Sequence, residues 1–298
     1  MRESIIHCYR LKDGSWAKFD IIARYQSIIW TRRFTDVGSF QLTLPDCPLV
    51  PNDIIVHGRG CAGFVMKVEK TSGKTTVYGY DLKGFAAFRM LDETDFEIAK
   101  GASVSDTVKV LATKYLTTGK RAIEGLTVEE NSLTEKFEEA ISLSSCKISE
   151  AVSKCCIAAK LGWDIVWENG APVFRLLKPE SRSHLIFSRR RKNLDEASYV
   201  IDEYDAINTA AGEESDYCGI LRREGAAVSE KKEYVKASSE SADIGGECAL
   251  GDFITVSEYG FNAVVQITEV KTVYEPNRTI TVPTFGESGQ NLIKKLLG

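Results

Sequence analysis

Three carboxylates lie close together in the segment 202–205, where a pair of acids could cleave a glycosidic bond. Glycoside cleavage needs two carboxyl groups that face each other across a sugar. Here the apolar residues Tyr199, Ile201 and Tyr204 are interleaved with the acids, as in a half-buried strand. We therefore expect the acids to lie on a solvated strand face and not in a catalytic pair.

Other motifs for nucleophilic or phosphate chemistry are missing. A serine hydrolase would use Gly-x-Ser-x-Gly with a supporting histidine, and that pentapeptide does not occur. The glycine-rich segment 58–63 lacks the Lys-Ser/Thr pair of a phosphate-binding loop, so it predicts a turn. We expect no catalytic residues and no cofactor.

Metal ligation is not expected either. His7, His57 and His184 are isolated from one another, and the only close cysteines, Cys155 and Cys156, are adjacent in an expected helix. A structural metal site uses pairs of Cys or His two to four residues apart, facing a second pair. The eight cysteines are therefore expected to be free, buried thiols.

One basic run, Arg189 to Lys192, stands alone without stacking aromatic residues. A solvated turn, a protein contact in an assembly and a nucleic-acid site are all compatible with it, and the solvated turn is favoured. The formal net charge of −4 provides no basic face for wrapping nucleic acid. With 298 residues and 43% hydrophobic content, the chain predicts an ordered globular protein of two modest domains, or of one large domain with an insertion.

The first part of the chain predicts β-strands. Alternating or apolar runs at 5–11, 16–22, 27–34, 40–44, 54–56, 63–68 and 75–80 are separated by turn residues. Asp13-Gly14 and Asn169-Gly170 are the clearest hairpin signals, because both residues of such turns take positive φ.

Helical periodicity occurs only in the middle of the chain. Val104, Val108, Leu111 and Tyr115 share one face, which predicts a helix after Ser103. A second helix is expected to run from about Ile148 through Val152, Cys155 and Ala159 and to stop at Gly162, where the absence of Cβ suits a left-handed cap.

An internal repeat links the two ends of the chain. Asn52-Asp53 precedes an aliphatic hairpin in which Val65 follows Asp53 by 12 residues. Gly251-Asp252 precedes a second hairpin in which Val264 follows Asp252 by 12 residues. A true structural repeat and a chance likeness between β-hairpins both explain this match, and the repeat is favoured.

Several segments, taken in order, resemble the siphophage and prophage tail hub (baseplate hub) family, related to the N-terminal region of tail-associated lysins and to contractile-tail baseplate hubs. They are residues 29–34 and 38–42, 63–65 with 68–69, 79–82 with 88–89, 161–163, 270–274 and 282–286.

This resemblance implies an α+β, mainly β fold with two similar β-barrel-like, tail-tube-like domains that flank a mixed helical insertion. The expected domains are 1–90, a first β-barrel-like hub domain; 91–180, a mixed α/β insertion; and 181–298, a second β-barrel-like hub domain. Members that carry a lysin continue into an endopeptidase or muramidase domain. Because this chain ends at Gly298, we expect it not to be an enzyme.

The family also implies a homotrimeric ring at the distal end of the tail tube. Its expected partners are the tail tube or distal tail protein on one side and a spike, fibre or tip protein on the other. DNA would pass through the pore without specific binding. Charge and histidine near Met1 are unlike a secretory signal, so we expect synthesis in the bacterial cytoplasm, with no membrane insertion, and a final place in the virion tail.

Two alternatives stay open. A non-catalytic, host-surface carbohydrate-binding tail module would show clusters of exposed Trp or Tyr on a groove. A tail-associated cell-wall hydrolase component would lyse peptidoglycan.

Overall fold

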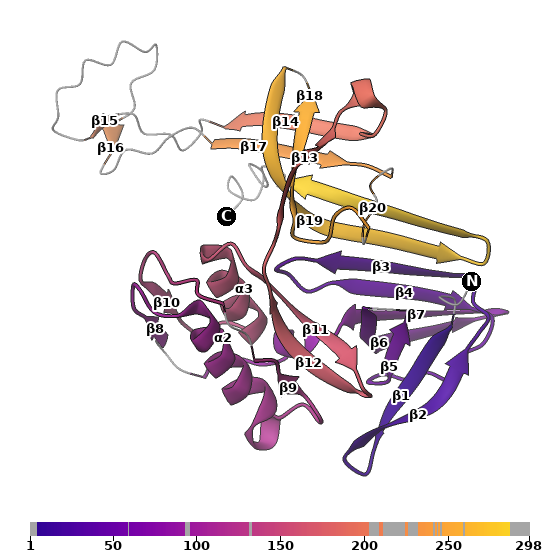
Figure 1. Ribbon diagram of the computed structural model, residues 1–298. Helices are drawn as coiled ribbons and strands as arrows, with labels where there is room; N and C mark the ends of the chain where they lie inside the picture. Colours follow the sequence, from indigo (N-terminus) through magenta and orange to yellow (C-terminus); the bar gives the residue numbers. More distant parts are fainter. Residues whose placement is uncertain are drawn as a thin grey trace.

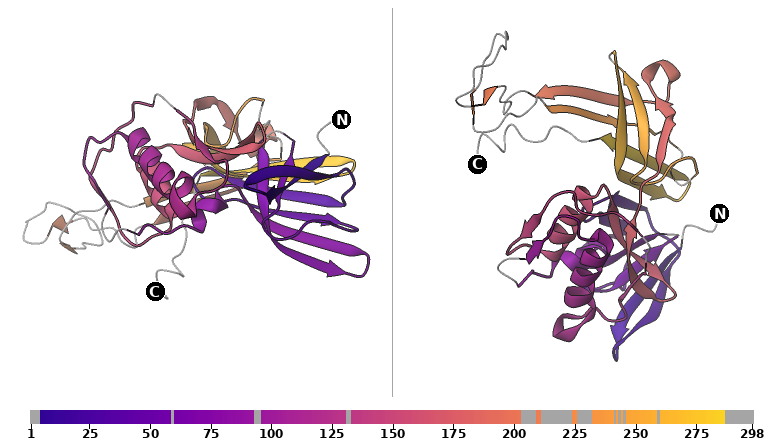
Figure 2. Two further views of the ribbon diagram at one scale, coloured as in Figure 1. Left: turned by 90° about the horizontal axis from the view of Figure 1, so that it is seen from below. Right: turned by 60° about the vertical axis from the view of Figure 1, so that its left-hand side comes forward.

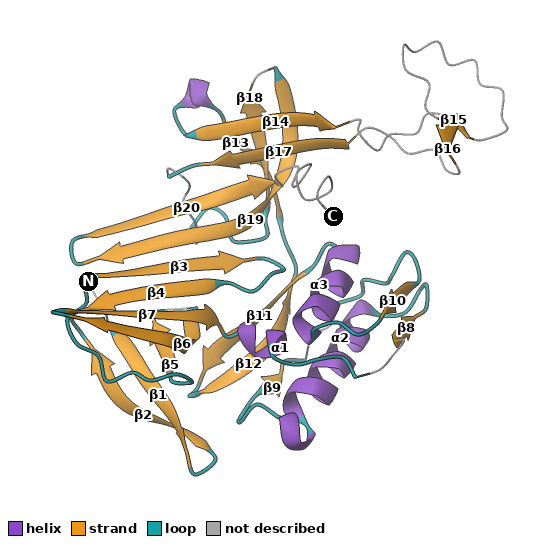
Figure 3. Ribbon diagram, turned by 180° about the vertical axis from the view of Figure 1, so that it is seen from behind, coloured by secondary structure: helices purple, strands orange, loops and turns teal. Residues whose placement is uncertain are grey.

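A computed structural model of the chain describes residues 5–58, 60–92, 96–130, 133–202, 209–210, 224–225, 232–240, 242, 244, 246–258 and 260–286. The fold is mainly β (Figure 1). Thirteen strands belong to one large sheet, in which nearly all neighbours run antiparallel. A helical insertion packs beside the N-terminal part of that sheet (Figure 3).

The N-terminal strands lie in the order β3-β4-β7-β6-β5-β1-β2. Their bounds are β1 Ile6–Lys12, β2 Ser15–Ile22, β3 Ser27–Arg33, β4 Ser39–Leu44, β5 Ile54–His57, β6 Cys61–Thr71 and β7 Lys74–Asp81. The expected turns are confirmed: Asp13 and Gly14 both take positive φ between β1 and β2, and Gly73 does so between β6 and β7. One face of these strands buries a core around Trp30, Phe40 and Leu42.

The described part of the insertion contains the three α-helices, two other helices and two short sheets. Its elements are α1 Gly84–Ala87, β8 Phe96–Ile98, α2 Val104–Ala112, the π-helix η1 Thr113–Thr117, the 3-10 helix η2 Gly119–Arg121, β9 Thr127–Val128, β10 Ile141–Leu143, α3 Ile148–Ala158, β11 Gly162–Glu168 and β12 Ala171–Leu177. The two sheets are β8-β10 and β9-β12-β11. The β11–β12 hairpin lies between the helices and the N-terminal strands (Figure 3). Asn169 and Gly170 form its turn, both with positive φ, as predicted.

The two predicted helices are confirmed with one correction. Ser103 caps α2 by accepting a hydrogen bond from the Asp106 N–H, and the predicted apolar face is buried. However, Gly162 does not end α3 as a left-handed cap, because Lys160 is the residue with positive φ (+55°). Gly162 begins β11 instead, and a Cβ there would lie 2.3 Å from the Phe34 ring.

The C-terminal strands continue the same sheet. They are β13 Ser181–Phe187, β14 Glu196–Asp202, β17 Lys232–Ser238, β18 Phe253–Glu258, β19 Phe261–Glu275 and β20 Arg278–Gly286, with the 3-10 helix η3 Arg189–Arg191 between β13 and β14. A separate parallel pair joins β15 Thr209–Ala210 to β16 Glu224–Gly225. The second half of β19 pairs with β3, which joins the C-terminal strands to the N-terminal ones (Figure 2).

The two groups of strands have the same order. In the N-terminal unit, defined as β1 and β3 to β7, the order is β3-β4-β7-β6-β5-β1. In the C-terminal unit, defined as β13, β14 and β17 to β20, it is β14-β17-β20-β19-β18-β13. Each strand thus has a counterpart at the same place in both the chain order and the sheet order.

One pairing differs between the units. β1 runs antiparallel to β5, whereas β13 runs parallel to β18. In the chain, the strand β2 lies between β1 and β3, whereas no strand lies between β13 and β14. Because the chain has one strand fewer between β13 and β14 than between β1 and β3, β13 runs in the direction opposite to that of its counterpart β1.

The described residues form three hydrophobic cores, one in each unit and one in the insertion. Within the same part of the chain the strands form open sheets, and none of the sheets closes into a barrel. No helix there is both long enough and apolar enough to span a membrane.

Candidate assembly interface

Asp53 and Asp252 hold equivalent turns at the start of β5 and β18. The Asp53 carboxylate accepts a hydrogen bond from the Val50 N–H (2.8 Å), and its own N–H donates to the Val50 carbonyl (3.2 Å). Asp252 makes the same two bonds with Ala249, at 2.9 and 3.1 Å. Both aspartates are buried, and each forms an ion pair with an arginine of the adjacent strand. The Nε of Arg10, in β1, lies 2.7 Å from the Asp53 carboxylate, and the Nε of Arg182, in β13, lies 3.9 Å from the Asp252 carboxylate.

The residues before the two aspartates are also equivalent. Asn52 and Gly251 both have positive φ, +74° and +101°. The Asn52 backbone N–H donates to the Val65 carbonyl, and the Val65 N–H donates to the Asp53 carbonyl. Gly251 and Asp252 make the same pair of bonds with Ile267. Val65 and Ile267 are therefore counterparts.

A shared irregularity confirms this correspondence. The ladder between β6 and β7 shifts register between Val65 and Lys67, and the ladder between β19 and β20 shifts between Ile267 and Glu269. Because a bulge leaves one residue unpaired, Met66 and Thr268 are counterparts too.

The repeat predicted from the sequence exists, but its alignment was wrong. The prediction aligned Val264 with Val65, whereas Val264 pairs with Thr255 near the middle of the β18–β19 hairpin. Ile267, 15 residues after Asp252, is the true counterpart. The second hairpin is longer by three residues, and such a difference in length cannot be seen in alternating aliphatic residues.

The junction between the units is the pairing of β19 with β3. Glu269 lies opposite Arg33, and their side chains form an ion pair at 2.8 Å. The Phe34 N–H then donates to the carbonyl of the bulge residue Thr268 (3.0 Å). The Phe34 ring is buried against Gly251 and Gly162, where an added Cβ would lie 2.2 and 2.3 Å from it. The absence of a side chain at Gly162 and Gly251 therefore allows the Phe34 ring to pack directly on the backbone at this junction.

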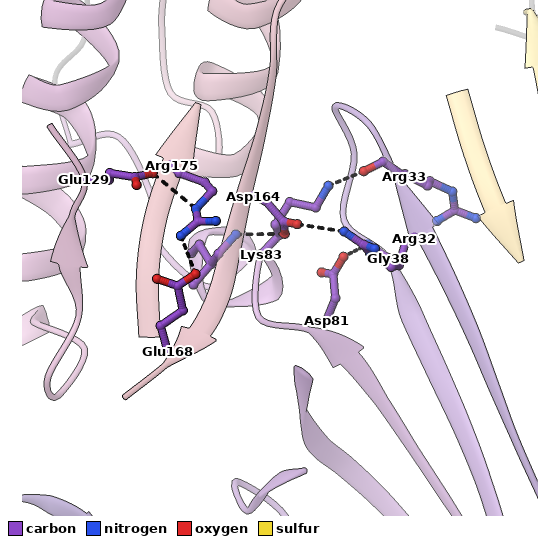
Figure 4. A network of polar contacts seen from close by, with 10 residues as sticks. Arg32, Arg33, Gly38, Asp81, Lys83, Glu129, Asp164, Glu168 and Arg175 are labelled. Atoms are coloured by element: carbon purple, nitrogen blue, oxygen red, sulfur yellow. Dashed lines mark hydrogen bonds and ion pairs between the residues drawn. The ribbon is translucent and has the colours of Figure 1, made fainter. Parts of the chain in front are cut away.

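A network of buried charges fastens the insertion to the N-terminal unit (Figure 4). Arg32 of β3 donates to Asp164 of β11 at 3.2 Å, and Asp81 accepts from the Gly38 N–H at 2.8 Å. Lys83 donates to the Arg33 carbonyl, and its ammonium lies 5.3 Å from the centre of the Trp163 ring.

Burial perturbs these groups. It raises the pKa of Asp81 to about 6, against the opposing attraction of Lys83, and it lowers the pKa of Lys83. Such shifts also occur in acid–base catalysis. The contacts of the network join β3 to β11, so they connect the N-terminal unit to the insertion.

No model of a protein family matches this sequence, and no curated protein matches it either. Solved structures do match it. A prophage tail protein, gp18, from Listeria monocytogenes EGD-e has a TM-score of 0.59 at 13% identity, covering 99% of this chain and 97% of its own. The 43 kDa tail protein of prophage MuSo2 from Shewanella oneidensis has a TM-score of 0.57 at 12% identity, covering 94% and 97%. A tail protein from Neisseria meningitidis MC58 has a TM-score of 0.54 at 15% identity, covering 95% and 97%.

The chain has the fold of phage tail proteins. At these identities the likeness establishes the fold, and it confirms at that level the resemblance noted in the sequence. It extends over the insertion as well as both strand units, because the matches cover almost the whole chain.

The open strand edges of the sheet are not at the strands whose aliphatic sequence suggests them. The segments 254–256 and 264–267 carry few charges and no proline, a pattern typical of a poorly protected edge, but β18 has β13 on one side and β19 on the other. In the described part of the chain, open edges include β14, which pairs only with β17, and the half of β6 beyond Val65, where β5 has ended. The outer sides of β2 and β13 are open as well.

The other singled-out residues lie apart from one another. Arg189 to Lys192 form an exposed 3-10 turn after β13, as favoured by the sequence, and the Arg189 N–H donates to Glu258. Asp202 ends β14, whereas residues 203–205 lie outside the described part of the chain. The segment 58–63 is the β5–β6 turn and the start of β6, as predicted, with Arg59 undescribed. The seven described cysteines are all buried thiols, which confirms their predicted state, and Cys218 lies outside the described residues.

Proposed function

We propose that the chain is a structural subunit of a phage-type tail baseplate hub and that three copies form a ring at the distal end of the tail tube. The repeated strand order carries this proposal. A chain with two equivalent units, joined by pairing between β19 and β3, can present six similar faces in a threefold ring. Six faces suit docking onto a sixfold tail tube.

The ring would link the tube or distal tail protein to the spike, fibre or tip parts. In this arrangement, 1–90 and 181–298 are two hub domains that complete tail-tube-like barrels in the assembly, and 91–180 is the insertion between them. The likeness of the fold to phage tail proteins supports this role and the virion tail as the location.

The sheet face opposite the two unit cores is the candidate pore wall. Two of the basic groups on this face are balanced by carboxylates, since Arg33 is paired with Glu269 and Lys67 with Glu69, and Lys271 is a further exposed cation there. DNA should pass such a surface without specific binding, because affinity for phosphate rises with each unbalanced cation. Arg189 to Lys192 are proposed to face away from the pore.

The role we propose is not enzymatic. Purified chain should leave peptidoglycan intact on a cell-wall zymogram, and lysis that a single acidic or histidine substitution abolishes would show that a hydrolase is present.

Mass photometry tests the ring directly, using the chain alone and the chain co-expressed with the proteins encoded beside it. The expected species has three copies of the chain in at least one of the two samples. A monomer in both would overturn the proposal.

A further inference from the structure

The intrachain junction predicts where a second copy of the chain attaches. We infer that the open edge of β14 in one copy pairs antiparallel with the outer half of β6, residues 66–71, in another copy. Ser198 lies opposite Glu69 in this pairing, and Ile201 enters a hollow beside Met66. This inference rests on the proposed ring and adds the strands, the register and the anchoring side chain.

The correspondence between the units supplies the strands. β19 of the C-terminal unit has its second half covered by β3. β6 is the counterpart of β19, and its second half has only β7 beside it among the described strands. β14 is the counterpart of β3, and no described strand pairs with its outer edge. The N-terminal unit of one copy therefore has an uncovered strand, β6, in the place of β19. The C-terminal unit of another copy has an uncovered strand, β14, in the place of β3.

The ladders supply the register. Val65 and Ile267 lie opposite Gly79 and Phe285, which in turn lie opposite Phe40 and Ala237. Phe40 pairs with Trp30, and Ala237 pairs with Ala197, so Trp30 and Ala197 are counterparts. It follows that Ser198 corresponds to Thr31, and Ile201 to Phe34. Thr31 lies opposite Lys271, whose counterpart is Glu69.

Ile201 is the anchor in this pairing. Its counterpart Phe34 is 2% exposed and packs on Gly251, whereas Ile201 is 52% exposed. The counterpart of Gly251 is Asn52, which lines a surface hollow of about 300 Å³. The other lining residues include Leu11, Trp16, Phe64, Met66 and Phe88.

The hollow and the side chain suit each other chemically. Apolar and aromatic side chains dominate the lining, and Met66 and Phe88 are themselves exposed. An exposed aliphatic side chain on one strand edge and an apolar hollow beside another gain free energy by burial together. The charged residues Lys67, Glu69 and Lys70 keep the β6 edge from pairing with any strand at random, so the Ile201 contact supplies selectivity.

Cysteine cross-linking tests the register. Phe34 and Thr268 form a hydrogen-bonded pair of the antiparallel ladder between β3 and β19. Because the two kinds of pair alternate along such a ladder, Thr31 and Lys271, three positions further on, form a non-hydrogen-bonded pair. Ser198 and Glu69 would form the same kind of pair. The Cα atoms of such a pair are about 4.5 Å apart, within disulfide range. Glu69→Cys/Ser198→Cys, with Cys218→Ser to remove the cysteine outside the described residues, should give covalent trimers on mild oxidation. Glu69→Cys/Glu196→Cys is the matched control, since diagonal positions lie about 7–8 Å apart.

A second pair of variants tests the anchor. Ile201→Asp should abolish the trimer, or shift its formation to at least tenfold higher concentration. Val110→Asp, at a position on α2 that is 53% exposed, should leave assembly unchanged. Circular dichroism should show that both variants fold.

The outcomes separate this inference from the proposed ring. A trimer by mass that cross-links no better through Glu69/Ser198 than through Glu69/Glu196, or that survives Ile201→Asp, overturns the β6–β14 pairing and leaves the ring standing. A chain that stays monomeric alone and with its neighbours overturns both.

Discussion

Phe40 lies opposite Gly79 in the ladder between β4 and β7, and its ring fills the space where a side chain on Gly79 would lie. The equivalent pair in the C-terminal unit is Ala237 opposite Phe285. The large residue is on β4 in the N-terminal unit, whereas in the C-terminal unit it is on β20, the counterpart of β7. The small residue occupies the other strand in each unit, so each pair still fills its core. Since packing density constrains the sum of the two volumes and not each residue, a structural repeat can persist while the sequence repeat fades.

The exchanged pair makes Phe285 a main support of the C-terminal core. Phe285 is fully buried and packs on Phe187 with ring centroids 4.9 Å apart. Phe285→Ala should lower the free energy of unfolding by about 3–5 kcal/mol, as expected for deleting a buried ring. Urea denaturation measures this loss. Phe88→Ala, at a half-exposed ring, should cost far less, and equal costs would contradict the core assignment.

The equivalent aspartates should be equally important. Asp53→Asn and Asp252→Asn each weaken a buried, charge-assisted set of hydrogen bonds, and each should lower the free energy of unfolding by about 1–3 kcal/mol. Asp46→Asn changes an exposed carboxylate and should stay within about 0.5 kcal/mol. If only one of the two buried positions were sensitive in thermal melts, the equivalence of the turns would fail.

Gly162 should resist substitution because of Phe34. The added methyl group of Gly162→Ala meets the Phe34 ring at 2.3 Å, and we expect a loss of about 1–3 kcal/mol from overpacking. Adding Phe34→Leu should recover part of this loss. A double-mutant cycle in chemical denaturation measures the coupling, and strictly additive effects would argue against the contact.

His57 should make stability depend on pH. Burial lowers the pKa of His57 to about 4, and its Nε2 lies 3.1 Å from the Tyr25 hydroxyl. The unfolded chain, with a histidine pKa near 6.5, binds more protons between pH 4 and 6.5, so stability falls as the pH drops through this window. His57→Gln should reduce that slope relative to the wild type in melts at several pH values. An unchanged slope would contradict a buried, neutral His57.

The sequence predicted local structure well where the turn residues decide it. Asp13-Gly14 and Asn169-Gly170 set two hairpins through positive φ, and the period of Val104 to Tyr115 set a helix. It failed where a distant contact decides the role of a residue. Gly162 resembled a helix cap in sequence, and its actual role is set by the ring of Phe34 in another part of the chain.

Which strands have an open edge could not be predicted from local sequence either. Whether a strand is an edge depends on its neighbours in the sheet, so the aliphatic segment 254–256 suggested an open edge although β13 covers it. The contact between Arg32 and Asp164, 132 residues apart, likewise has no local signal. Asp53 and Asp252, which precede β5 and β18, were the best sequence clue, because their turn needs a specific side chain.

The central claim, that this chain is a ring-forming hub subunit, is tested most directly by cryo-electron microscopy of the assembled protein. The account predicts a threefold ring in which the β5–β6 and β18–β19 hairpins alternate at six equivalent places around one pore. A particle with no threefold axis, or a threefold particle in which the two hairpins lie at different radii from the pore, would contradict it.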